Sequence, residues 1–236
     1  MRGNIQSKIN VVRYGDDSII TGDSRRMLEE EVKPAVEAFL SERGLSLSEE
    51  KTRIVPIELG FEFLGQNPRK YGGKLLIKPS RPSVKAFLRN LKETIRKHGH
   101  GKVEVLIEAL NSKIRGWANY HRHVVSGRVF GFVDNWLYHQ LWAWMKRRHR
   151  KKRKSWLVEN YWMKGATPWT FSTVAEDEQG NARLHQLVKL HTIGIRRHVK
   201  IRGDANPYDP KDQNYFRKRH AQGHSPSSAR RRRRKT

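Results

Sequence analysis

The stretch SVKAFLRNLKETIRKHG, residues 83–99, decides the fold of the second part of the chain. Its apolar residues recur every three or four positions, as on one face of an amphipathic helix, and Gly99 follows where a helix commonly ends. The same period runs from Leu106 to Trp117 and again from Val129 to Trp144. We therefore expect three antiparallel helices with short links, which form a small bundle.

The first 80 residues show short apolar runs between turn residues. Ile9 to Arg13 and Ser18 to Thr21 flank Gly15-Asp16-Asp17, which predicts a hairpin with two carboxylates at its tip. A helix is expected from a cap at Ser24 to Gly44, with Pro34 as a kink or a late start.

Four strand-sized pieces follow this helix, with turn residues between the last two. These pieces are Leu45 to Leu47, Ile54 to Val55, Phe61 to Leu64 and Leu75 to Ile77. Strands with one covering helix predict a partial α/β layer, so the fold class expected for the chain is α+β.

The pattern divides the chain at changes of composition. Residues 1–80 form the strand-containing part, 81–155 the helical part and 156–202 a basic extension. Residues 203–236 are rich in Pro, Asp, Asn, Gln and Ser and end in an arginine run, so we expect a mostly disordered tail.

Charge and composition restrict the partners. Lys and Arg number 49 against 23 Asp and Glu, which gives a formal net charge of +26 and makes nucleic acid the expected partner. No cysteine is present, which excludes a disulfide, a thiolate zinc site and a cysteine nucleophile. No apolar run has membrane-spanning length, so we expect no membrane partner. No secretory signal is visible and the lack of cysteine fits a reducing cytosol, so we expect a cytoplasmic nucleoprotein of a bacterium or an organelle.

RYGDDSII, residues 13–20, places two adjacent aspartates on the predicted hairpin. Such carboxylates suit Mg²⁺, which binds carboxylate and phosphate oxygens and assists phosphoryl transfer. A solvated Gly-Asp turn is the alternative explanation for the four residues Tyr14 to Asp17. The motif alone does not decide between a metal site and such a turn.

The order of motifs adds information. GLSLSEEKTRI (residues 44–54), GFEFLGQ (60–66) and LNSKIRGWANYHRH (110–123) follow the aspartates at plausible spacing. Together these motifs resemble the group II intron reverse transcriptase and maturase family, over residues 11–215. That family has Tyr-Ala-Asp-Asp in its palm, and here Gly15 replaces the alanine.

The resemblance implies roles for five residues. Asp16 and Asp17 match the catalytic, Mg²⁺-binding palm aspartates, and Tyr14 lies beside the primer terminus. Lys51 matches a lysine near the incoming triphosphate, although a surface ion pair with a neighbouring glutamate is an equally open interpretation. Gly65 matches a hairpin under the primer, where glycine permits close backbone approach, and a core strand is the alternative.

The resemblance also shows what the palm motif needs. The family's palm uses a further aspartate on a preceding strand, and fingers that bind template and nucleotide; too few residues precede Asp16 to supply them. The chain thus resembles the C-terminal part of such an RNA-directed DNA polymerase, a nucleotidyltransferase of mobile introns. DNA synthesis is expected only with an N-terminal half, supplied in trans or by a longer chain.

The helical part resembles the thumb, or X domain, which in this family grips group II intron RNA and aids splicing. Its cations, amides and aromatic groups suit phosphates and unpaired bases, whereas Trp117 is expected in the core. A solvated helix end is the alternative for the run from residue 146, in which eight of nine residues are Lys or Arg. The RNA-binding residues predicted are Arg115, Asn119, Tyr120, Arg122, Lys146, Arg147, Arg148, Arg150, Lys151, Lys152, Arg153 and Lys154.

Arg196, Arg197, His198 and Lys200 could extend this surface. An HNH-type nuclease, common at the end of family members, is not supported, because His220 and His224 occur without cysteine pairs. Two other functions stay open: an enzyme completed by a second chain, and a general basic nucleic-acid-binding protein descended from the family. A viral RNA-dependent polymerase is disfavoured by the thumb motif.

Overall fold

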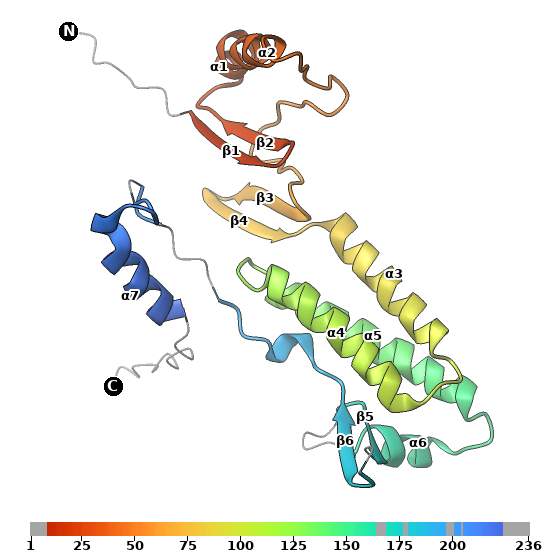
Figure 1. Ribbon diagram of the computed structural model, residues 1–236. Helices are drawn as coiled ribbons and strands as arrows, with labels where there is room; N and C mark the ends of the chain where they lie inside the picture. The colour runs from red at the N-terminus through yellow and green to blue at the C-terminus, as the bar shows by residue number, and fades with distance from the viewer. Residues whose placement is uncertain (1–8, 164–168, 177–178, 197–200, 204, 224–236) are drawn as a thin grey trace, which may run out of the picture. The chain divides into compact units, whose positions relative to one another are not determined.

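The computed structural model describes residues 9–163, 169–176, 179–196, 201–203 and 205–223. The chain forms two units, residues 1–197 and 198–236. Both helices and small antiparallel sheets are present (Figure 1), which confirms the mixed α and β class.

The N-terminal hairpin forms as predicted. Strand β1 (Asn10–Tyr14) pairs antiparallel with β2 (Asp17–Thr21), and Tyr14 lies opposite Asp17. Gly15 takes a left-handed φ of +59°, which a two-residue hairpin turn requires at its first position.

The predicted helix 24–44 is split by a π-helical turn. Ser24 caps α1 (Arg25–Met27) by accepting a hydrogen bond from the Met27 N–H at 3.2 Å. The π-turn η1 (Leu28–Val32) follows, and α2 (Lys33–Ser41) then begins with Pro34 in its first turn, where proline is tolerated.

Gly44 lies just beyond the end of α2, in the left-handed conformation that the sequence predicts for it. Gly44 has a φ of +67°, and its N–H donates to the Ser41 carbonyl at 3.0 Å. The next N–H, of Leu45, donates to the Leu40 carbonyl at 3.0 Å. The two bonds form the Schellman motif that satisfies carbonyls at a helix end.

The predicted strand at Phe61 to Leu64 is wrong. The second hairpin instead pairs β3 (Gln66–Tyr71) with β4 (Lys74–Pro79) through a turn at Gly72 and Gly73. Leu64 and Gly65 both have left-handed φ, +48° and +70°, and this conformation interrupts an extended strand.

Residues 9–80, as the structure describes them, do not form the predicted layer of strands under one helix. The hairpins β1–β2 and β3–β4 form separate two-stranded sheets. Among described residues before Pro79, Met27 alone is buried, and Phe39 on the apolar side of α2 is 55% exposed. An apolar stripe predicts burial only where a complementary face packs on it, and in the described chain none covers Phe39.

The three predicted helices form the main core. They are α3 (Arg81–Lys97), α4 (Val103–His121) and α5 (Gly127–Arg148), and they lie side by side in Figure 1. Ser80 caps α3 by accepting a hydrogen bond from the Ser83 N–H at 3.2 Å. Core residues with almost no exposed surface include Leu91, Leu106, Leu110, Ile114, Phe130, Leu137, Leu141 and Met145.

Residues after 153 complete this core. Helix α6 (Lys154–Tyr161) and the hairpin of β5 (Ser172–Glu176) with β6 (Ala182–Gln186) pack against the bundle. The Phe171 ring stacks on Tyr161 at 5.5 Å and meets Trp144 edge-on at 6.1 Å.

Residues 187–193, which we call the strap, run along the bundle and include the 3₁₀ turn η2 (Leu190–Thr192). Asn111 of α4 donates to the Gln186 carbonyl at 2.9 Å and accepts from the Val188 N–H at 2.7 Å. Asp134 of α5 accepts from the N–H groups of Leu190 and His191 at 2.8 and 2.9 Å. Two helix side chains thus take the place of a pairing strand for the strap.

The second unit contains η3 (Pro210–Asp212) and α7 (Gln213–Gly223), so part of the predicted tail is helical. Buried Asp212 accepts from the Asn206 N–H at 3.0 Å and pairs with Arg202. These bonds order a short polar segment without a large core. His224 and the final arginine run lie outside the described residues, as do Arg197, His198 and Lys200.

Candidate nucleic-acid interface

The tip of the β1–β2 hairpin carries the predicted palm residues. Asp16 lies in the turn and Asp17 begins β2, and both are exposed. Tyr14 is opposite Asp17 and is 67% exposed. The Arg13 Nε donates to the Gly15 carbonyl at 3.0 Å, which fixes the turn beside the two carboxylates.

Lys51 and Gly65 lie on other segments. Lys51 is exposed on a turn in which the Thr52 N–H donates to the Ser48 carbonyl at 2.8 Å. No ion pair joins Lys51 to Asp16, Asp17 or a glutamate in the described chain. The Gly65 carbonyl accepts from the Ser80 N–H at 2.9 Å, so this glycine allows β3 to meet the start of α3.

Mg²⁺ with three carboxylate ligands does not fit the described residues. They include no group of three or more His, Cys, Asp or Glu side chains placed to hold a metal ion. Asp16 and Asp17 are two exposed carboxylates on one hairpin, and a two-metal polymerase site needs more ligands than these.

Helix α4 presents Arg115 and Asn119 on one side, and Arg122, its C-cap residue, continues the same helical spacing. Arg122 donates to the Asn119 side-chain oxygen at 3.1 Å, and its carbonyl accepts from the Arg196 N–H at 2.9 Å. Tyr120 has a structural contact, because its hydroxyl donates to the Leu64 carbonyl at 2.6 Å.

Trp117, predicted in the core, is partly buried and packs against the core. Its ring stacks on Phe87 with 4.5 Å between centroids and 2° between planes. It also lies 4.4 Å from the ring of buried His121, whose Nε2 is 3.4 Å from the Ser83 hydroxyl. Burial, together with nearby His123, lowers the pKa of His121 to about 4.

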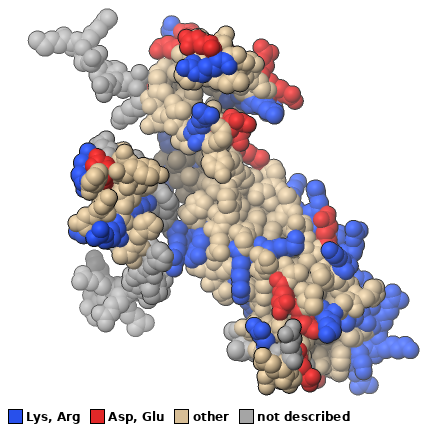
Figure 2. All heavy atoms as spheres, viewed as in Figure 1, with Lys and Arg blue, Asp and Glu red and all other residues tan. Residues whose placement is uncertain are grey.

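Residues 146–154, which we call the basic turn, comprise the end of α5, the link between the two helices and the first residue of α6. The face in Figure 2 shows Lys and Arg side chains gathered where these helices meet. The lysine and arginines in the last turn of α5 also interact favourably with the negative end of the helix dipole. The exposed cations of the basic turn are Lys146, Arg147, Arg150, Lys151, Lys152, Arg153 and Lys154.

Two residues of the basic turn hold it in place. Arg148 donates to the carbonyls of Gly99 and Gly101, at 3.4 and 2.8 Å, and its guanidinium lies 5.2 Å from the Trp144 ring. The Nε2 of His149 is 2.7 Å from the Tyr161 hydroxyl. Burial, then the charges of Arg148 and Lys152, lower the pKa of His149, so the ring is neutral at neutral pH.

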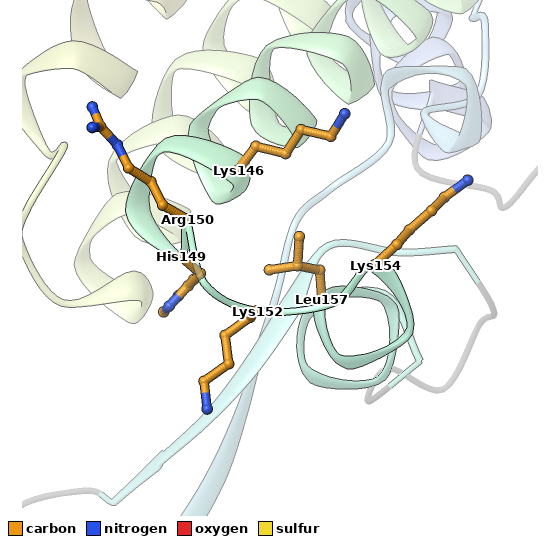
Figure 3. Close-up of a pocket in the computed structure, with 6 residues that line it drawn as sticks. All are labelled: Lys146, His149, Arg150, Lys152, Lys154 and Leu157. Atoms are coloured by element: carbon orange, nitrogen blue, oxygen red, sulfur yellow. The ribbon is translucent and has the colours of Figure 1, made fainter.

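A pocket of about 360 Å³ lies at the basic turn. Its lining, drawn in Figure 3, is cationic except for His149 and the apolar Leu157. The six lining residues are Lys146, His149, Arg150, Lys152, Lys154 and Leu157. No carboxylate lines it, so an anion is the ligand that its charge favours.

Sequence reasoning missed the aromatic partners of these cations. The ammonium groups of Lys146 and Lys154 lie 6.0 and 5.8 Å from the centroid of the Trp142 ring, and that of Lys152 lies 5.1 Å from the Trp156 ring. The spacing of four residues between Trp142 and Lys146 was a visible signal for one of these pairs.

Residues 84–162 match the family described as "Group II intron, maturase-specific domain". This segment covers the bundle, the basic turn and α6. The resemblance that the sequence predicted is therefore confirmed for residues 84–162, which are similar to the maturase-specific domain of group II introns.

Two curated relatives match the chain over slightly more than 100 residues each. The "Ribosomal operon-associated A protein" of Euglena gracilis is 24% identical over 106 residues, and that of Euglena longa is 26% identical over 102 residues. Each match covers 43% of this chain and 20% of the relative, so the chain spans about a fifth of the length of these relatives. In the part of the chain that the structure describes, no helix is both long and apolar enough to cross a bilayer.

Proposed function

We propose that the helical domain binds structured group II intron RNA and assists its splicing. The observation that carries the proposal is the coincidence of the maturase-specific match with the basic turn, because residues 146–154 lie inside residues 84–162. Exposed cations without carboxylates in their pocket suit RNA phosphates, and a net charge of +26 strengthens the attraction.

DNA synthesis is proposed only for a complete polymerase site. In this proposal Asp16 and Asp17 bind Mg²⁺ together with a carboxylate from another segment or a second chain, and Tyr14 and Lys51 face primer and nucleotide. The test adds the N-terminal half of a group II intron reverse transcriptase in trans and measures primer extension. Extension that depends on both aspartates supports the proposal, and extension unchanged in Asp16→Asn contradicts it.

The test of RNA binding uses the full chain and a group II intron RNA from the genome that encodes it. Affinity is measured across a salt series, and splicing of the same RNA is timed with and without the chain. A basic-turn variant changes to Gln the residues Lys146, Arg150, Lys152 and Lys154. If each of the four cations contacts one phosphate, the plot of log affinity against log salt concentration becomes less steep in the variant. Its slope decreases in magnitude by about 3.

A matched control makes the same change of net charge elsewhere. The four control residues, two in α1, one in α2 and one just after α2, are changed to Gln and are Arg25, Arg26, Lys33 and Arg43. Each pairs with a glutamate, so their loss leaves the basic turn intact. We expect the control to retain most of the salt slope; an equal loss in both variants contradicts binding at the basic turn.

General nucleic-acid binding is the second candidate, and the net charge of +26 favours it. Electrostatic binding to phosphates carries no sequence information. An unrelated structured RNA of the same length therefore distinguishes the two functions. Equal affinity for both RNAs at every salt concentration, with no effect on splicing, supports the general binder.

A further inference from the structure

Helix α5 carries an aromatic ridge that leads into the basic turn. Tyr138, Trp142 and Lys146 follow one another at intervals of four residues, so they lie on one side of the helix. The rings of Tyr138 and Trp142 are stacked, with 6.2 Å between centroids and 20° between planes. Both are partly buried and pack against the core, which holds them in place.

Two cations from different helices lie over the same indole. Lys146 comes from the end of α5 and Lys154 from the start of α6, and both ammonium groups lie within about 6 Å of the Trp142 centroid, the usual range of a cation–π contact. Figure 3 shows both side chains extending to the same side of the turn, while Lys152 extends the other way.

Neither ammonium forms an ion pair with a carboxylate in the described ranges. The side chains of Lys146 and Lys154 are exposed and flexible enough to move from the ring toward a phosphate. When the two lysine side chains move away, a flat apolar group can stack on the face of the Trp142 ring. A surface that combines an aromatic face with two free cations matches the chemistry of a nucleotide that is not base-paired.

We propose that Trp142, with Lys146 and Lys154, binds an unpaired nucleotide: the base stacks on the indole and the adjacent phosphates contact the two ammonium groups. Leu157, which is 2% exposed, also lines the pocket. The inference rests on the proposed function, because the nucleotide belongs to the RNA that the basic turn attracts, and it specifies single-stranded segments as the bound element.

The test measures fluorescence anisotropy of the full chain with a labelled twelve-nucleotide single-stranded RNA and with an RNA hairpin duplex. In Trp142→Leu the single-stranded affinity falls by roughly 5- to 150-fold, the range for loss of one base stack, while duplex affinity changes less than about 3-fold. Trp142→Phe keeps a stacking face and restores most of the affinity. Single-stranded DNA of the same sequence tests whether the ribose contributes to binding. Base stacking alone should give DNA and RNA the same affinity.

Trp136→Leu is the matched control, since Trp136 lies on the same helix and packs partly buried against the core without a cation over its ring in the described structure. Thermal melting of each variant shows whether it is folded. Unchanged single-stranded binding in Trp142→Leu overturns the inference, as does an equal loss on duplex or an equal loss in folded Trp136→Leu. Failure of the unsubstituted chain to bind either RNA would instead contradict the proposed function.

Discussion

His121 makes the stability of the helical domain depend on pH. The ring is 1% exposed, packs against Trp117 and Tyr120, and has a pKa lowered to about 4 from an ordinary 6.5. In the unfolded chain the same ring takes up a proton near pH 6.5. Between these two pKa values the unfolded state binds more protons, so the free energy of unfolding rises with pH in that window.

The magnitude follows from the two pKa values. The contribution is fully present above pH 6.5, is lost as pH falls toward 4, and amounts to about 3 kcal/mol in total at 1.36 kcal/mol for each pKa unit. Between pH 7.5 and pH 5 the loss is about 2 kcal/mol. Urea denaturation followed by tryptophan fluorescence at both pH values measures it.

The substitution His121→Leu removes the titrating group and keeps an apolar side chain beside Trp117. We expect the loss of stability between pH 7.5 and pH 5 to shrink by about 2 kcal/mol in this variant. His100→Asn removes an exposed histidine of the α3–α4 loop and serves as control, with no change expected. An unaltered pH dependence in His121→Leu would refute the assignment.

Three further substitutions test contacts that hold the domain together. Asp134→Ala removes the acceptor for two strap N–H groups and should lower the free energy of unfolding by about 1–3 kcal/mol, with faster hydrogen exchange at residues 190–191. Tyr120→Phe loses the hydrogen bond to the Leu64 carbonyl, and we expect a loss of about 0.5–1.5 kcal/mol in urea denaturation. Gly60→Ala places a Cβ 2.9 Å from the Arg69 Cβ at a φ of +73°, so limited proteolysis should cut the nearby chain faster.

The local elements could be predicted because their signals are local. The apolar period gave the three long helices, and Gly44 and the Gly72-Gly73 pair stand at the turns where their freedom at positive φ is needed. The start of α3 differs by two residues, because Ser80 caps the helix before Pro82, and proline is tolerated in a first turn.

The long-range contacts could not be predicted. The strap is held by Asn111 and Asp134, which stand 56 to 77 residues from their partners and look like ordinary polar positions on a helix. The lysines over Trp142 meet only because α6 folds back beside α5. The roles of Asp16, Asp17 and Lys51 stay predictions, since they depend on groups that the described chain does not bring together.

The strap also affects how the protein folds as it leaves the ribosome. Its contacts close onto α4 and α5, which are synthesised well before it, and contacts of large sequence separation form late. At a translation rate of about 5–20 residues per second, the roughly forty residues from the end of α5 to Leu190 take on the order of seconds. During that interval the part of the core surface that Leu190 later covers is open to chaperones and to other nascent chains, and a domain truncated before the strap would keep it open permanently.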